Sequence, residues 1–207
     1  MSIYLIWWPP KCEKMTLAKK MSKELWIPWI SADTLQWIAF AYLSDEERIS
    51  KFPSREMKWE NNDEKYWLHT TQEIIDAYVE QWKTSYPAVK MMVETYQVDE
   101  DSIIIEWYQI TPELVNQIEK KYWTVHKIFL TRSDKEAFVS DIPKSSTPND
   151  RIIRKTKDPD TYRKIAKMVA IYSSYFEQEA QKYKYRILSM DTNFEVKLDK
   201  AISFLTG

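Results

Sequence analysis

Short runs of apolar residues alternate along the chain with longer stretches in which apolar side chains recur every three or four positions. A short apolar run bounded by turn residues is typical of a buried strand, and a longer periodic stretch is typical of an amphipathic helix. The predicted strands cover residues 2–8, 27–31, 103–106, 125–130 and 185–190. The predicted helices cover residues 16–25, 35–43, 69–81, 87–96, 113–122, 160–182 and 193–205.

Capping residues support several of the predicted helix starts. Ser44 precedes Glu47 at the spacing of a capping box, which predicts a further short helix there. Thr111 and Pro112 fit the N-cap and the first helical position. Pro87 also suits a first turn, which favours two separate helices on either side of it. Two polar segments are predicted as loops, residues 53–66 and residues 141–158.

Strands that alternate with helices predict a parallel sheet that is covered on both faces. The expected fold class is therefore α/β, with three layers and about five parallel strands. We expect one domain over residues 1–207.

Composition and charge narrow the classes of function. Apolar residues make up 44% of the chain, enough to build a core, and the net charge of −1 provides no field for nucleic acid or anionic lipid. Cys12 is the single cysteine, which favours a reducing compartment. No apolar run approaches the roughly 18 residues of a membrane span. We therefore expect a cytoplasmic protein with neither a nucleic-acid nor a membrane partner. His69 and His126 lack partners at metal-ligand spacing, so a zinc site is not expected.

The glycine content is anomalous. At the usual frequency of about 7%, a chain of this length would contain roughly fourteen glycines. It contains one, Gly207, together with ten tryptophans. Turns and helix ends need residues that tolerate positive φ, and glycine is the usual choice.

Several tryptophans stand where glycine is expected. Trp26, Trp82 and Trp123 each follow a predicted helix, at the position that commonly adopts the left-handed conformation. That conformation costs a residue with a Cβ roughly 1–2 kcal/mol. Trp29, in contrast, fits an ordinary buried strand aromatic.

These positions suggest the hypothesis that nine tryptophans occupy ancestral glycine positions. Some bacterial lineages read UGA as glycine, and translating such a gene with UGA as tryptophan would produce this pattern. The nine are Trp7, Trp8, Trp26, Trp37, Trp59, Trp67, Trp82, Trp107 and Trp123. The alternative is a tryptophan-rich protein whose rings pack in the core or stack on ligands.

With glycine at these positions, residues 3–18 resemble a strand followed by the Walker A loop of P-loop kinases, G-x-x-x-x-G-K-[ST]. Trp8 takes the place of the first glycine, and Lys14 falls on the lysine. In such a loop the backbone N–H groups and the helix N-terminus hold phosphates, the lysine reaches the β- and γ-phosphates, and a hydroxyl ligates Mg²⁺. The resemblance implies nucleotide binding by Trp8, Pro9, Pro10, Lys11, Cys12, Glu13, Lys14, Met15 and Thr16.

Two departures from the motif are not explained by recoding. Glu13 replaces the second glycine and places a carboxylate beside an anion. Met15 replaces the magnesium-binding hydroxyl, and a thioether is a poor ligand for a hard cation. Thr16 lies one position too late.

Two further strands resemble those of small-molecule kinases related to 2-phosphoglycerate kinase, shikimate kinase and adenylate kinase. In residues 27–35 the resemblance places Asp33 toward substrate or the magnesium shell, whereas the simpler interpretation is a helix N-cap. In residues 103–112 it places Glu106 near Mg²⁺ or the acceptor hydroxyl. The simpler interpretation of Glu106 is a solvated carboxylate at a strand end.

Arginines complete the set of candidate catalytic residues. Arg132 follows the predicted strand 125–130. The resemblance implies a helical insertion on the substrate side around residues 44–98 and a lid-like segment around residues 141–158, which contains Arg151 and Arg154. In the family that the chain resembles, such arginines neutralise the transferring phosphoryl group. The alternative for Arg151 and Arg154 is a solvated basic stretch. Residues 175–180 and 190–195 resemble the end of the same kinases, so the resemblance spans nearly the whole chain.

Together these features predict an ATP-dependent phosphotransferase that acts on an alcohol group of a small hydroxylated or phosphorylated metabolite. Lys14 would hold phosphate. Asp33 and Glu106 would position the metal ion and the acceptor, and the three arginines would neutralise the charge of the transferring phosphoryl group. The expected cofactors are ATP and Mg²⁺. The alternative is a non-catalytic P-loop protein with a binding or structural role, which Glu13 and Met15 favour.

Overall fold

The computed structural model describes residues 1–9, 14–57, 59–122, 124–145 and 151–207. These residues form a five-stranded parallel sheet in the order β2-β3-β1-β4-β5. The strands are β1 (Ile3–Trp7), β2 (Trp29–Ser31), β3 (Ile103–Trp107), β4 (Val125–Thr131) and β5 (Ile187–Ser189). The predicted α/β class and the parallel pairing of the three inner strands are confirmed.

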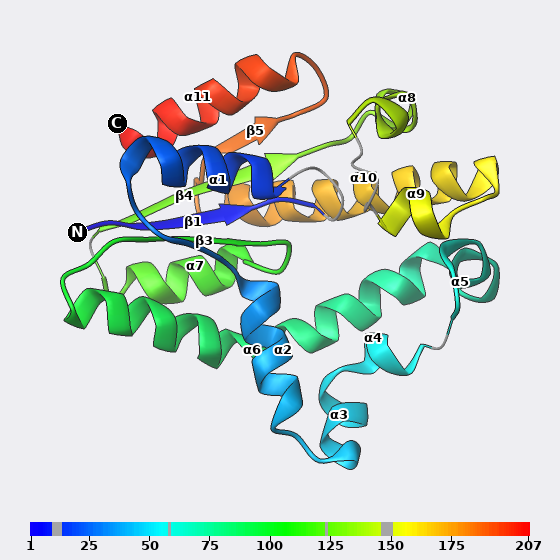
Figure 1. The fold of residues 1–207 in the computed structure, drawn as a ribbon, viewed down its shortest axis with the longest axis horizontal. Coiled ribbons are helices and arrows are strands. Elements are labelled where there is room, and N and C mark those ends of the chain that lie inside the picture. The colour runs from blue at the N-terminus through cyan, green and yellow to red at the C-terminus, as the bar shows by residue number, and fades with distance from the viewer. Residues whose placement is uncertain (10–13, 58, 123, 146–150) are drawn as a thin grey trace.

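Helices cover both faces of the sheet (Figure 1), with α1 and α11 on one face and α6, α7 and α10 on the other. The helices are α1 (Lys14–Leu25), α2 (Ala32–Ala41), α3 (Asp45–Lys51), α4 (Pro53–Glu56), α5 (Asn62–Leu68), α6 (Thr71–Val98), α7 (Pro112–Glu119), α8 (Lys135–Ser145), α9 (Arg151–Lys155), α10 (Pro159–Lys182) and α11 (Phe194–Thr206). The predicted capping box at Ser44 and the N-cap at Thr111 are both present.

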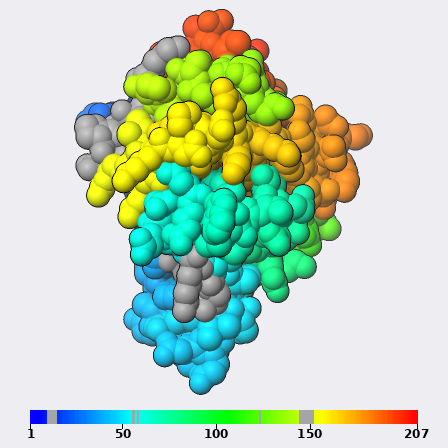
Figure 2. Space-filling model, turned by 90° about the vertical axis from the view of Figure 1, so that its right-hand side faces the viewer, coloured from blue at the N-terminus to red at the C-terminus, as the bar shows by residue number. Residues whose placement is uncertain are grey.

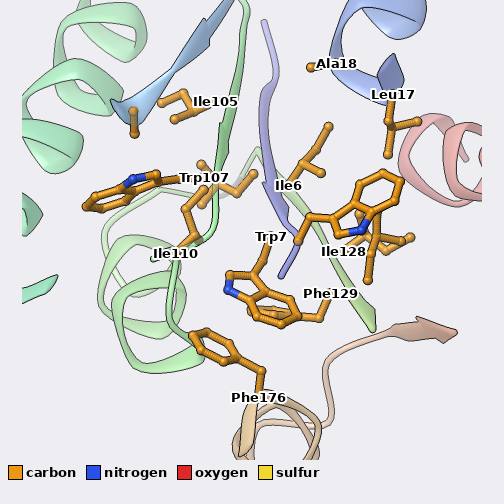
Figure 3. Close-up of a cluster of buried hydrophobic side chains, with 14 of the residues drawn as sticks. Ile6, Trp7, Leu17, Ala18, Ile105, Trp107, Ile110, Ile128, Phe129 and Phe176 are labelled. Atoms are coloured by element: carbon orange, nitrogen blue, oxygen red, sulfur yellow. The ribbon is translucent and has the colours of Figure 1, made fainter. Parts of the chain in front are cut away.

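The inner strands are buried because each has a strand on either side and helices on both faces. Every residue of β1 and of β3 is buried. Trp7 at the end of β1 stacks on Phe176 of α10 with a centroid distance of 4.0 Å, and its indole N–H donates to the carbonyl of Tyr108 at 2.8 Å. Figure 3 shows Trp7 and Phe176 facing each other beside Phe129.

Several predicted boundaries are wrong. The stretch predicted as two helices is one helix, α6, with Pro87 inside it. Trp82 therefore lies within a helix and is buried, not at a helix end with positive φ. Residues 53–66, predicted as a loop, contain α4 and most of α5, while α8 and α9 occupy parts of residues 141–158.

The prediction for Trp26 is confirmed. It follows the last residue of α1, has a φ of 56° and leaves 92% of its side chain exposed. Its ring therefore gains almost no burial in return for the strained backbone. Trp123 lies outside the described residues. Trp29 is partly buried, with the ammonium of Lys19 5.6 Å from its ring centroid.

Candidate functional site

The candidate site lies where the inner strands end. In parallel α/β sheets, ligands bind beyond the carboxyl ends of the strands. Glu106 of β3 is fully buried and lies in register with Ile6 of β1 and Ser31 of β2. Because side chains alternate along a strand and Trp7 packs on α10, Ile6 and Glu106 point to the face covered by α1. The simpler interpretation of Glu106 as a solvated carboxylate is wrong.

Asp33 lies at the same end of the sheet, in the first turn of α2. The N-cap of α2 is Ser31, so the interpretation of Asp33 as the N-cap is wrong. Its carboxylate accepts a hydrogen bond from the indole Nε1 of Trp107 at 3.0 Å. Since the Trp107 ring is fully buried, it holds the Asp33 carboxylate at the edge of the sheet. The fold thus brings together the ends of β2 and β3, which carry the two acidic residues.

The segment predicted to bind phosphate connects β1 to α1, as the motif requires. Trp8 and Pro9 are buried, and α1 begins at Lys14. Pro10, Lys11, Cys12 and Glu13 lie outside the described residues, as does the side chain of Lys14. Met15 is 49% exposed and Thr16 is also exposed, so both stand in solvent at the start of the helix.

The Trp8 ring packs in the core near the start of α11. It is fully buried, 5.9 Å from the ring of Phe194 at the start of α11. Its indole N–H has no hydrogen-bond partner among the described residues. A buried donor without a partner costs roughly 1–3 kcal/mol, so the core accommodates this side chain imperfectly.

Arg132 directly follows β4, and its side chain is nearly buried. The guanidinium forms an ion pair with Asp141 of α8 and lies over the ring of Phe138, 5.3 Å from its centroid. Its backbone N–H donates to the Ser173 hydroxyl at 3.0 Å. This arrangement anchors α8 to the end of the sheet. The buried Nε of Arg132 has no hydrogen-bond partner among the described residues.

The lid-like segment includes α9, which lies at the carboxyl end of the sheet (Figure 1). Figure 2 shows α5, α9 and α8 as adjoining bands across this end of the molecule. Arg154 is exposed on α9, and the side chain of Arg151 lies outside the described residues.

Hydrogen bonds to α5 hold the segment that follows α9. The Asp63 carboxylate accepts from the backbone N–H groups of Lys157 at 2.8 Å and Asp158 at 3.3 Å. Burial opposes the charge of Asp63, yet these donors and the Thr161 hydroxyl keep its pKa below the usual range. The backbone at Lys157 and Asp158 is therefore joined to α5 by an ionised carboxylate.

Gln109 is a candidate residue that the sequence analysis missed. It follows β3 by two residues, is fully buried, and neither atom of its side-chain amide has a hydrogen-bond partner among the described residues. A buried amide normally has hydrogen-bond partners, so this side chain is a candidate for contacting the acceptor substrate. The sequence signal is a polar residue within the strand-end segment that carries Glu106.

The described residues contain no group of three or more His, Cys, Asp and Glu side chains arranged to hold a metal ion. No helix in the described part of the chain is both long and apolar enough to cross a bilayer.

Comparisons with known proteins identify the fold. No protein-family model matches the sequence, and no curated protein matches it. Among solved structures, an uncharacterised protein from Eubacterium ventriosum has a TM-score of 0.53 at 15% identity, covering 99% of this chain and 98% of that one. A gluconokinase from Sinorhizobium meliloti has a TM-score of 0.53 at 8% identity, covering 99% of this chain and 91% of that one.

A shikimate kinase from Bacteroides thetaiotaomicron has a TM-score of 0.50 at 15% identity, and the match covers 98% of this chain and 94% of that one. Each of these matches covers nearly the full length of both compared chains. The chain therefore has the P-loop kinase fold. At such low identity the likeness establishes the fold alone.

Proposed function

We propose that this chain is built as an ATP-dependent phosphotransferase whose acceptor is an alcohol group of a small hydroxylated or phosphorylated metabolite. The observation that carries the proposal is the convergence of Asp33, Glu106 and the β1–α1 segment at one end of a P-loop kinase sheet. In phosphoryl transfer the protein contributes mainly positioning and electrostatic stabilisation, and this edge can supply both.

Each predicted residue has a role consistent with its place. Lys14 opens α1 and would bind phosphate together with the helix N-terminus. Asp33 in the first turn of α2 would orient the acceptor, and Glu106 would contribute negative charge beside the phosphates for a bound cation. Arg132, Arg151 and Arg154 would neutralise the transferring group.

The residues present do not fit a magnesium ion bound in the usual way. Position 15 carries the thioether of Met15, which is a poor ligand for Mg²⁺, and Glu13 adds a negative charge next to the phosphates. We therefore expect this polypeptide to bind ATP weakly or not at all. The same two residues favour the second candidate function, a non-catalytic P-loop protein.

We further propose that the nine tryptophans stand at glycine positions of the active protein. The positive φ of Trp26 supports this, as does the buried indole N–H of Trp8, which lacks a partner among the described residues. Trp37, Trp67 and Trp82 lie inside helices, where the backbone does not require glycine. The codons decide the question: UGG at these nine positions would contradict recoding.

A titration with ATP and Mg²⁺, read by isothermal calorimetry, tests the proposed function. The chain as written is compared with a variant carrying Glu13→Gly and Met15→Ser, and with a second variant that also carries Trp7→Gly and Trp8→Gly. We expect the unaltered chain to bind at least about a hundredfold more weakly than the fuller variant, because two or three charge-assisted hydrogen bonds of roughly 1.5–3 kcal/mol each are restored. ADP release with a panel of sugar acids and polyols then tests transfer.

Lysine variants provide the matched control. In the background that binds ATP, Lys14→Ala should abolish binding, whereas Lys23→Ala at the other end of α1 should leave it unchanged. Absence of binding in every variant, with cooperative unfolding retained, would favour the non-catalytic function. Micromolar affinity in the unaltered chain would contradict the roles assigned to Glu13 and Met15.

A further inference from the structure

A pocket of about 560 Å³ lies at the amino end of the sheet, opposite the candidate site. It is lined by the start of β4, the end of α7, the turn between α10 and β5, and Phe204 near the end of α11. In Figure 1 this is the end of the molecule at which both chain termini lie. A ligand bound there would not contact the β1–α1 segment.

The short β5 strand creates this pocket. β5 pairs only with Phe129, Leu130 and Thr131, so it does not extend along the first half of β4. The chain instead turns after α10, with Lys184 in the left-handed conformation at a φ of 57°. His126 and Lys127 of β4 consequently line a recess that a longer strand would have filled.

Positive charge predominates in the pocket. Lys127, Lys184 and Arg186 line it together with a single acidic residue, Glu119. Lys127 forms an ion pair with Glu119, which also accepts a hydrogen bond from the Tyr185 hydroxyl at 2.5 Å. The charge of Glu119 is thus already satisfied, leaving Lys184 and Arg186, both exposed, to bind an anion.

Aromatic rings line the same pocket and are held in place by neighbours. The His126 ring stacks on Tyr4 with a centroid distance of 4.9 Å, and the Tyr183 ring stacks on Tyr185 at 5.5 Å. Arg186 lies over the ring of Phe204, 4.1 Å from its centroid. Burial lowers the pKa of His126, so this ring is neutral at pH 7 and presents a flat, uncharged surface.

We propose that this pocket binds a small phosphomonoester that carries a planar ring, of the class of nucleoside monophosphates. Such a ligand has a charge of about −1.5 to −2 at pH 7, which matches the two cations left by the Lys127–Glu119 pair. The Tyr185 ring stacks on both Phe129 and Tyr183, so the His126 and Tyr183 rings supply the stacking surface for the planar group. Arg186 can contact both the phosphate and the ring. The volume lies in the range of small-molecule sites, about 300–1,000 Å³.

The test uses the full chain and adenosine 5′-monophosphate as the probe, with binding followed by amide chemical shifts. We expect saturable shifts at residues 125–127 and 183–186. Ribose 5-phosphate, inorganic phosphate and adenosine should each bind at least about tenfold more weakly, because each lacks the ring or the charge. Shifts confined to the β1–α1 segment, or equal affinity for adenosine, would overturn the proposal.

Matched variants distinguish binding in this pocket from nonspecific attraction of the ligand to positive charge. Arg186→Ala and Lys184→Gly remove exposed cations, and glycine keeps the left-handed backbone at position 184. Each should weaken binding at least about tenfold. Lys182→Ala, which removes a neighbouring cation already paired with Glu179 outside the pocket, should leave affinity unchanged. An equal effect of all three variants would overturn the proposal.

Discussion

Trp26 shows at the scale of one residue how the sequence conflicts with the fold. Its φ of 56° is a conformation that favours glycine, and its exposed ring offers little packing energy in return. We expect Trp26→Gly to raise the free energy of unfolding by about 1 kcal/mol, as measured by urea denaturation.

Trp37→Gly is the control for this prediction. Trp37 is half exposed like a typical surface aromatic but lies in the middle of α2, where glycine lowers helix stability by about 1 kcal/mol or more. The two changes should therefore have opposite signs. Destabilisation by both would mean that the Trp26 ring contributes more than its exposure indicates.

The lowered pKa of His126 predicts that the free energy of unfolding depends on pH. Burial lowers its pKa below 6.5, so the unfolded chain binds a proton on this residue more readily than the folded chain does. This contribution to stability is fully present above the unfolded pKa and is lost as pH falls from about 6.5 through the lowered pKa. Urea denaturation from pH 8 to pH 5 should show the loss, and His126→Gln should remove that part of the slope. A slope unchanged by His126→Gln would contradict the assignment.

At the scale of secondary-structure elements, a proline in the interior of α6 lowers the stability of that helix. Pro87 lies on its exposed side, in the interior of a helix of 28 residues. Proline there leaves the carbonyl of Lys83 without its usual helical donor and costs up to about 3 kcal/mol. We expect Pro87→Ala to raise the free energy of unfolding by about 1–3 kcal/mol in urea denaturation. No gain would mean that the helix has already adapted its backbone around the proline.

The same helix shows why some boundaries could be predicted and others could not. Proline suits both a first turn and a tolerated interior position, and only packing against the sheet distinguishes the two. The helix α5 was missed because its segment is polar, although Asn61 accepts from the N–H of Glu64 in a cap that the sequence contains. The strands were predictable because buried parallel strands are continuous apolar runs.

Some features of the candidate site could likewise be predicted from the sequence, and others could not. The position of Asp33 and Glu106 at one end of the sheet could be predicted, because the carboxyl ends of parallel strands meet there. The hydrogen bond from Trp107 to Asp33 and the ion pair between Arg132 and Asp141 depend on side-chain packing and have no signature in sequence spacing. The basic pocket was missed for the same reason, since its cations come from segments far apart in the chain.

At the scale of the whole molecule, the two ends of the sheet have different chemistry. The carboxyl end holds the acidic pair and the lid-like segment, whereas the amino end holds the basic pocket. β4 extends between them, from His126 and Lys127 to the residue before Arg132. The proposed nucleotide site and the proposed phosphomonoester site are therefore separate surfaces joined by one buried strand.

The sheet itself should open from its edges inward. β1 lies between β3 and β4 with every residue buried, whereas β2 and β5 are three-residue edge strands. Opening free energies range from near zero in weakly packed segments to the global value in the core. We expect amide hydrogen exchange, followed by NMR, to be slowest at Leu5 and Ile105 and at least about tenfold faster at Ile30. Exchange at Ile30 as slow as at Leu5 would contradict this order, because it would require β2 to open only with the whole molecule.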